Sequence, residues 1–156
     1  KYKTDLSIIK SVVKSNDQRK ITLTKRIDKI LKNRLKNKNI TFLGVTFKPN
    51  TDDMREASSI PMVNYLNKKG CKIRYYDPSG RKKEFDKLKN VKFYSSISSA
   101  CIKSDLIIIH TEWNAFKLLN FKKLVKKKNF KVFDMRNIYS QDKMRDLKID
   151  YTSIGR

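Results

Sequence analysis

The chain has 156 residues, of which 38% are hydrophobic and 10% aromatic, so it can bury a core as one ordinary domain. Its formal net charge of +23 favours a nucleic-acid or other anionic partner. No apolar run approaches the roughly 20 residues that cross a bilayer, and no signal-peptide core follows the N-terminus. Because the first residue is not Met, we expect a piece of a longer chain.

Residues 4–37 are expected to be helical. Apolar residues recur at helical spacing in two stripes, the first including Leu6 and Val13 and the second running from Leu23 to Leu35. Between them, Asn16-Asp17-Gln18 indicates either a break or an exposed turn of one long helix. We expect residues 1–38 to be a helical linker segment and residues 39–156 to form an α/β domain.

From residue 40 onward, strand patterns alternate with helix patterns. Short apolar runs predict strands at residues 40–45, 71–76, 91–94, 106–109, 130–134 and 151–154. Helices are expected from an N-cap at Ser58 or Ser59 to Gly70, and at residues 82–88, 97–103, 114–128 and 141–147. The pattern predicts a doubly wound, mainly parallel, six-stranded Rossmann-like α/β sheet with right-handed crossovers, preceded by a helical segment.

The positive charge consists mostly of lysine and is spread through every segment. The densest run, at residues 122–128, has helical spacing beside Phe121 and Leu124, which favours a solvated helix face over a weak anion-binding surface. A basic RNA- or DNA-binding α/β domain is an alternative interpretation, although no RRM, KH or helix-turn-helix pattern is visible.

Four residues of types that often react or bind ligands are interpreted as parts of the folded structure and not as site residues. Cys71 and Cys101 lie in separate apolar or helical runs, which indicates buried thiols in a cytoplasmic setting and neither a disulfide framework nor a metal site. His110, the only histidine, ends a buried strand and is interpreted as a satisfied imidazole and not as a general base. Trp113 is interpreted as a packing anchor for its loop and not as a stacking platform for a base.

Polar side chains follow the predicted strands where a doubly wound sheet binds its ligands. These ends are residues 46–57, Asp77-Pro78, residues 110–113 and residues 134–137. The first loop has Gly44 alone where a dinucleotide-binding domain carries G-x-G-x-x-G, so the chain is not expected to bind NAD by itself in the usual way. Asp77 resembles a ribose-binding acid, but Pro78 after it favours a turn residue.

The loop at residues 46–57 offers cations for a phosphate. Lys48 is a mobile cation, and Arg55 has a bidentate fork. The alternative is that the acidic residues of the loop pair with these two cations and brace it; they are Asp52, Asp53 and Glu56. The composition of the loop leaves both interpretations open.

Residues 43–56, Leu-Gly-Val-Thr-Phe-Lys-Pro-Asn-Thr-Asp-Asp-Met-Arg-Glu, closely resemble the signature of the C-terminal domain of the UDP-glucose and GDP-mannose dehydrogenases. The resemblance continues in order through residues 76–78, 110–116 and 134–139. Asn16 with Gln18 resembles the end of the long central helix that joins the two halves of these enzymes and forms their dimer contact. The Thr-Glu-Trp at 111–113 and the Arg-Asn-Ile-Tyr at 136–139 favour the UDP-glucose branch over GDP-mannose or UDP-N-acetylmannosamine relatives.

The resemblance implies oxidation of the sugar C6 alcohol, which converts UDP-glucose to UDP-glucuronate. Two NAD molecules each accept a hydride, and a cysteine forms a thiohemiacetal and then a thioester. That cysteine belongs, in this family, to a Gly-Gly-Ser-Cys-Phe-like segment upstream of the stretch matched here. We therefore expect no catalytic residue and no metal site in this chain, with NAD bound mainly by the N-terminal half of the enzyme. A cytoplasmic homodimer without a membrane segment is also implied.

Residue by residue, Phe47 and Lys48 match the pair that contacts the UDP-sugar, Lys48 through hydrogen bonds to its polar groups. Arg136 matches the arginine that binds the uridine ribose, and Arg55 matches an arginine that reaches across the cleft to NAD on the other half. The family usually has Gly before the arginine that matches Arg136. Here Met135 adds a side chain that is expected to tighten or redirect this loop.

Overall fold

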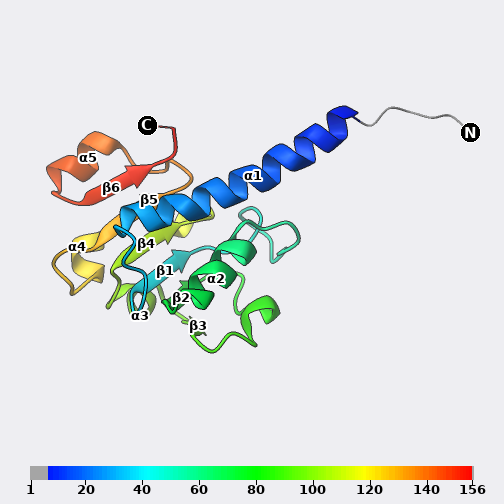
Figure 1. Ribbon diagram of the computed structural model, residues 1–156. Helices are drawn as coiled ribbons and strands as arrows, with labels where there is room; N and C mark the ends of the chain where they lie inside the picture. The colour runs from blue at the N-terminus through cyan, green and yellow to red at the C-terminus, as the bar shows by residue number, and fades with distance from the viewer. Residues whose placement is uncertain (1–6, 156) are drawn as a thin grey trace, which may run out of the picture.

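The strands form one parallel sheet in the order β3-β2-β1-β4-β5-β6 (Figure 1). The computed structural model describes residues 7–155. The strands are β1 (Asn39–Leu43), β2 (Lys72–Tyr76), β3 (Val91–Phe93), β4 (Leu106–Ile109), β5 (Lys131–Asp134) and β6 (Asp150–Ser153). This order is that of a dinucleotide-binding sheet, with the switch point between β1 and β4. The predicted six-stranded, doubly wound fold is confirmed, and the sheet is parallel throughout.

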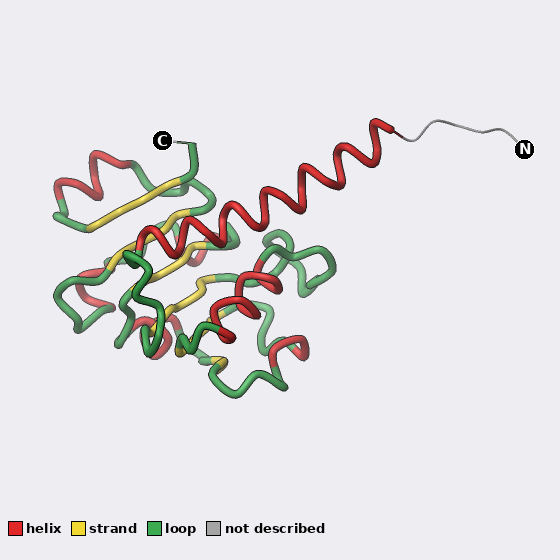
Figure 2. The backbone as a smooth tube through the Cα atoms, viewed as in Figure 1, coloured by secondary structure: helices red, strands yellow, loops and turns green. Residues whose placement is uncertain are grey.

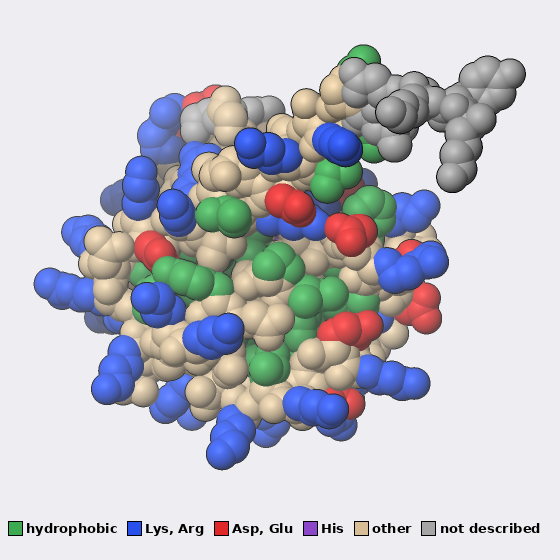
Figure 3. Space-filling model, turned by 45° about the vertical axis from the view of Figure 1, so that its right-hand side comes forward, with side chains coloured by type: hydrophobic (Ala, Val, Ile, Leu, Met, Phe, Trp, Pro, Cys, Tyr) green, Lys and Arg blue, Asp and Glu red, His purple; other side chains and the backbone are tan. Residues whose placement is uncertain are grey.

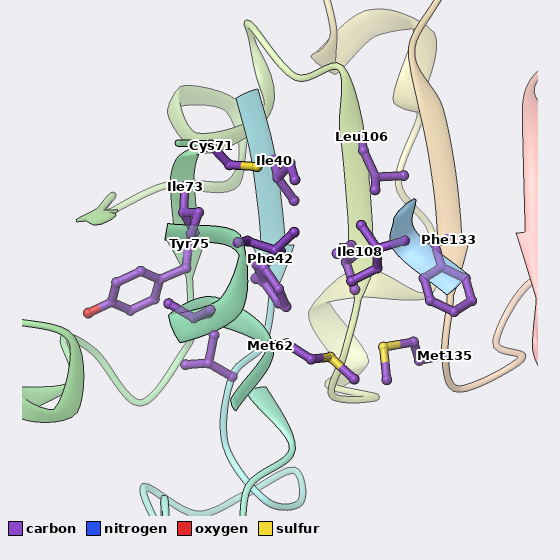
Figure 4. Packing of buried hydrophobic residues seen from close by; sticks show 14 of the residues in the cluster. Ile40, Phe42, Met62, Cys71, Ile73, Tyr75, Leu106, Ile108, Phe133 and Met135 are labelled. Carbon is purple, nitrogen blue, oxygen red and sulfur yellow. The ribbon is translucent and has the colours of Figure 1, made fainter. Parts of the chain in front are cut away.

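Each face of the sheet has its own core, because successive strand residues point to opposite sides. On the first face, side chains from four strands pack side by side; they are Ile40, Phe42, Ile73, Tyr75, Leu106, Ile108 and Phe133 (Figure 4). Helices α1 (Ser7–Ile30) and α2 (Ser59–Lys68) contribute to this core. On the second face, Leu43, Ile107 and Ile109 pack with residues of α3 (Ile97–Cys101), α4 (Phe121–Leu124) and α5 (Gln141–Asp146).

Helix α1 is continuous through Asn16-Asp17-Gln18, so this segment is an exposed turn of one long helix. Residues 4–6, where the prediction begins, lie outside the described residues. The helix ends at Ile30, and the predicted end at residue 37 is wrong because Lys32 and Asn33 adopt left-handed backbone conformations (φ 51° and 58°). The C-terminal half of α1 packs on the sheet, whereas its N-terminal half projects beyond it (Figure 2).

Two predicted helices are much shorter in the structure. The segment at residues 82–88 contains only a 3-10 turn, η1 (Lys83–Phe85). The expected helix at 114–128 is divided into a 3-10 turn, η2 (Asn114–Phe116), and α4. The side chain of Asn120 accepts a hydrogen bond from the Lys123 N–H and starts α4, and Val125 is extended and ends it. The lysines that follow therefore do not form a helix face.

The N-terminus of α2 lies where it was predicted, with Ser58 at the N-cap position, but no side chain caps it. The Ser58 hydroxyl lies 2.8 Å from His110 Nε2, and the Ser59 hydroxyl donates to the Val45 carbonyl. Pro61 is accommodated in the first turn, and Gly70 follows the helix end with a φ of +77°. Both serines tie α2 to the strand ends, which is where the polar residues of the chain gather.

Lys and Arg side chains are spread over the face of the molecule seen in Figure 3, interrupted by a few Asp and Glu side chains. This distribution agrees with the even spread of lysine along the sequence. Within residues 7–155, no helix has both the length and the apolar character needed to cross a membrane.

Candidate functional site

The switch point between β1 and β4, where a dinucleotide-binding sheet opens its crevice, is filled by the chain itself. Gly44 follows β1 with a φ of +73°, and a Cβ atom there would lie 2.6 Å from the Thr111 Cβ. The Thr111 hydroxyl donates to the Thr46 carbonyl at 2.8 Å, and both threonines are fully buried. The glycine therefore permits close packing of two strand ends, and no space is left between them for a pyrophosphate.

Asp77, at the end of β2, satisfies the loop N–H groups that would otherwise face an anion. Its Oδ2 accepts the Val45 N–H at 2.8 Å and the Thr46 N–H at 3.4 Å, and its Oδ1 accepts the Ser79 N–H at 2.9 Å. The Gly80 N–H closes the turn on the Asp77 carbonyl at 2.9 Å. Asp77 is therefore a buried turn residue, as its sequence context indicated, and is not exposed to a ribose.

The loop at residues 46–57 is braced by its own charges. Arg55 forks onto Asp53, with Nε 3.0 Å from Oδ1 and Nη2 2.8 Å from Oδ2, and these hydrogen bonds lower the Asp53 pKa to about 2. Glu56 accepts a hydrogen bond from Lys20 of α1 at 2.7 Å, which lowers the Glu56 pKa. The bracing interpretation is thus correct for Arg55. Lys48 is exposed and forms no salt bridge with the described residues; its charge acts on Asp53 at longer range.

Arg136, just after β5, links three strand ends. Its Nε donates to the His110 carbonyl at 2.7 Å, and its Nη2 lies 3.5 Å from the Phe47 carbonyl. The same Nε lies 3.0 Å from Glu112 Oε2, but its N–H is directed at His110. Within the described chain, this buried Glu112 oxygen therefore has no hydrogen bond. The Arg136 N–H is held by Asp134 at 2.9 Å, which fixes the start of the loop.

A cleft of 750 Å³ lies between α1 and these strand ends. Phe47, 51% exposed, and Arg136 contribute from the sheet side, and Arg19, Lys20 and Leu23 contribute from α1. The structure thus brings Phe47 and Arg136 into one cleft. The other two predicted site residues do not line it: Lys48 is exposed on the adjoining loop, and the Arg55 side chain is 89% exposed.

Met135 also borders the cleft but directs its side chain into the first core, beside Met62 (Figure 4). Its N–H donates to the Ile109 carbonyl at 3.0 Å, so it continues the pairing of β5 with β4. The methionine thereby closes the inner wall of the cleft, and Arg136 begins the turn away from the sheet.

His110 and both cysteines are buried as expected, and Trp113 is half-buried. His110 Nδ1 lies 3.0 Å from the Thr111 hydroxyl, and burial, followed by the nearby charge of Arg136, lowers the His110 pKa to about 3. Burial raises the pKa of Cys71 to about 11 and that of Cys101 to about 12, so neither is a thiolate at neutral pH. Trp113 packs against the second core. No metal-binding group of three or more His, Cys, Asp or Glu occurs within residues 7–155.

The sequence did not identify the contribution of α1 to the cleft. Lys20 and Leu23 belong to the same helical stripe as the buried Ile27, which places them toward the sheet. The signal was therefore present in the helical spacing. The contact of Lys20 with Glu56 joins residues 36 positions apart, and only the folded chain shows it.

Comparison with known proteins gives consistent matches. A family model described as "UDP-glucose/GDP-mannose dehydrogenase family, UDP binding domain" matches residues 41–141. The UDP-glucose 6-dehydrogenase of Rickettsia typhi is 35% identical over 99% of this chain and 36% of its own length, and that of Rhizobium meliloti is 32% identical over the same shares. The chain thus spans about a third of the length of these curated relatives.

Solved structures share the fold. A UDP-D-ManNAc dehydrogenase from Pyrococcus horikoshii superposes with a TM-score of 0.77 at 22% identity, covering 99% of this chain and 35% of that one. A UDP-glucose dehydrogenase from Pyrobaculum islandicum gives a TM-score of 0.72 at 22% identity, covering 96% of this chain and 32% of that one. All these matches are dehydrogenases, so a nucleic-acid-binding domain is not favoured.

Proposed function

The chain belongs to the UDP-glucose/GDP-mannose dehydrogenase family, and we propose that it is the nucleotide-sugar-binding part of an NAD-dependent UDP-glucose 6-dehydrogenase. The observation that carries this proposal is the cleft in which Phe47 and Arg136, from two separate strand ends, meet α1. Its position at the carboxyl ends of the strands is where doubly wound sheets bind ligands. The curated relatives named above carry the UDP-glucose 6-dehydrogenase name, which supports this substrate over GDP-mannose or UDP-N-acetylmannosamine.

In this proposal, each site residue has a distinct role. The half-exposed ring of Phe47 offers an apolar surface to the UDP-sugar. Arg136 already uses Nε and Nη2 on backbone carbonyls, which orients the guanidinium toward the cleft for the uridine ribose. Lys48 binds polar groups of the sugar nucleotide, and because it has no salt bridge with the described residues, it loses no such partner on binding. The products of such an enzyme would be UDP-glucuronate and NADH.

Arg55 is proposed to contact NAD bound on the N-terminal half of the enzyme, which is not part of this chain. Its side chain is 89% exposed, and its guanidinium is held by Asp53 of the same loop. NAD supplies the hydride acceptor in such a reaction. The residues of this chain supply binding and orientation only, since both cysteines are buried and protonated at neutral pH. We therefore expect no NADH formation by the chain alone.

We also propose a homodimer formed through α1, with a cytoplasmic location. Helix α1 exposes an apolar row, most of it on the projecting half, that another copy can cover; it consists of Ile8, Ile9, Val12, Val13 and Ile21. A Val13→Glu variant is expected to be monomeric by light scattering, whereas Ser11→Glu, on the same exposed helix, is expected to keep the dimer. Residues 1–38 and 39–156 remain our proposed segments, joined by Ile27 and Leu31 in the first core.

Isothermal titration calorimetry tests the binding function. UDP and UDP-glucose are expected to bind, with GDP-mannose and UDP-N-acetylmannosamine weaker. Arg136→Ala should weaken binding by about 1–3 kcal/mol, the range for losing a charge-assisted hydrogen bond. Arg145→Ala, a matched loss of an exposed arginine paired with Asp142 on α5, should leave it unchanged. A folded chain that gives no heat with either uridine ligand at millimolar concentration would contradict the proposal.

A further inference from the structure

A second cavity, of 580 Å³, lies at the opposite edge of the sheet from the candidate cleft. It opens where β5 begins at Lys131 and β6 begins at Asp150. The cleft, in contrast, lies beyond the carboxyl ends of the strands. We call this second hollow the lysine cavity after the six lysines that line it: Lys122, Lys126, Lys127, Lys128, Lys131 and Lys148. No residue lines both sites.

Among the residues that the structure describes, two of these six lysines pair with a carboxylate. Lys131 pairs with Asp150, and Lys127 pairs with the nearly buried Asp105. Burial raises the Asp105 pKa, but the hydrogen bond from Lys127 and a second from a backbone N–H lower it overall, so this carboxylate stays ionised. Within residues 7–155, the other four lysines form no salt bridge; they are Lys122, Lys126, Lys128 and Lys148. The cavity therefore holds positive charge that the described residues do not offset.

The fold gathers these charges from two separate segments. Because α4 ends at Leu124, residues 126–128 follow it as a loop along the cavity and are not distributed around a helix. Lys148 comes from the far side, after α5, where it adopts a left-handed conformation with a φ of 51°. The apolar residues of its lining, which we call the floor, are Val125, Phe130 and Ile149. Like charges held around a concave, partly apolar surface attract an anion more strongly than the same charges on an open surface.

We propose that the lysine cavity binds a small polyphosphate anion of the triphosphate class. Lysine ammonium groups bind phosphate as point charges, and here several unpaired ones face one hollow. The volume of 580 Å³ falls within the range of small-molecule sites. The phosphates pair with the four free lysines, and the apolar floor is left for whatever group the phosphates carry. This site is independent of the nucleotide-sugar cleft.

Calorimetry with sodium triphosphate and with ATP tests the proposal. The variant Lys126→Gln/Lys128→Gln/Lys148→Gln removes three of the unpaired charges. The control Lys83→Gln/Lys87→Gln/Lys89→Gln removes the same net charge from exposed positions between β2 and β3. The cavity variant should lose at least about tenfold in triphosphate affinity, and the control less than about twofold. Equal affinity for both ligands assigns recognition to the phosphates, and tighter ATP binding adds a nucleoside contact with the floor.

Several results would overturn the proposal. One is the absence of triphosphate binding at low salt. Another is an equal loss of triphosphate affinity in the two triple variants, which would indicate only the general electrostatic field of the +23 chain. Displacement of triphosphate by UDP would place it in the cleft. A nucleic-acid surface would be indicated if single-stranded RNA bound far more tightly than triphosphate and if its binding depended on the control lysines as much as on the cavity lysines. If both triple variants still bind UDP, they are folded. If the triple cavity variant does not fold, the single variant Lys126→Gln replaces it in the same comparison.

Discussion

The buried imidazole of His110 makes the stability of this fold depend on pH. In the folded chain, burial and then the charge of Arg136 hold the His110 pKa at about 3. In the unfolded chain, the ring is in water and takes up a proton near its ordinary pKa of 6.5. As the pH falls, the unfolded state therefore binds a proton that the folded state does not. This contribution to stability is complete above pH 6.5 and is lost progressively toward pH 3.

The magnitude follows from the two pKa values. Between them, one group changes the free energy of unfolding by about 1.4 kcal/mol per pH unit. Because pH 5 lies about one and a half units below the unfolded pKa, a shift from pH 7 to pH 5 should cost about 2 kcal/mol. The carboxyl groups with lowered pKa values, Asp53, Glu56 and Asp105, stay ionised across this window in the folded chain. The main change above pH 5 is therefore assigned to His110.

Urea denaturation at pH 7, 6 and 5, followed by circular dichroism, measures this loss. His110→Gln keeps a polar group beside Ser58 and cannot take up a proton, so its stability should be nearly independent of pH in the same range. The reasoning is refuted if the wild-type chain keeps its stability to pH 5, or if the variant loses as much. NMR provides a second measurement, because the imidazole resonances of the folded chain should not titrate above pH 5.

Three further predictions concern the strand ends. Gly44→Ala should destabilise the chain by about 2–4 kcal/mol in urea denaturation, since it adds left-handed strain and overlap with Thr111; Gly80→Ala, with the same sign of φ but open space, should cost only about 1–2 kcal/mol. Asp77→Asn should cost about 1–3 kcal/mol by the same assay, because the amide cannot accept all the hydrogen bonds of the buried carboxylate. Asp53→Asn should leave stability nearly unchanged, as expected for an exposed ion pair, yet speed hydrogen exchange at the Arg55 N–H.

The sheet could be predicted from the sequence because its strands are continuous apolar runs. The interval 106–109 was predicted with the bounds that β4 has, and the other strands lie within two residues at each end. A buried parallel strand has a continuous apolar sequence regardless of which elements pack around it. The helices were less predictable, since short helices depend on local capping. Lysines at helical spacing after Phe121 suggested a continuous helix, but Asn120 starts a new helix and Val125 ends it one turn later.

The site was predictable in its strand-end residues and not in its shape. Phe47 and Arg136 follow β1 and β5, and the carboxyl ends of parallel strands share one edge of the sheet. The cations that line the cleft are determined by how the charged side chains pair, and the composition of the loop left that pairing open. Arg55 is held by Asp53, and Lys20, from a helix assigned to linking and dimerisation, joins the cleft wall. The helical spacing shows which side of α1 faces the sheet, but the contact of Lys20 with Glu56 joins residues 36 positions apart and has no local pattern.

These contacts together explain how one fold can be kept while its ligand position changes. In a dinucleotide-binding sheet, loop N–H groups after the first strand face a pyrophosphate, and glycines let it approach. Here Asp77 supplies the anion from within the chain, and Thr111 packs against Gly44 at the switch point. With that position filled, the open surface lies farther out, between the strand ends and α1. A ligand must then be held by side chains that project into the cleft, and Phe47 and Arg136 are placed to do so.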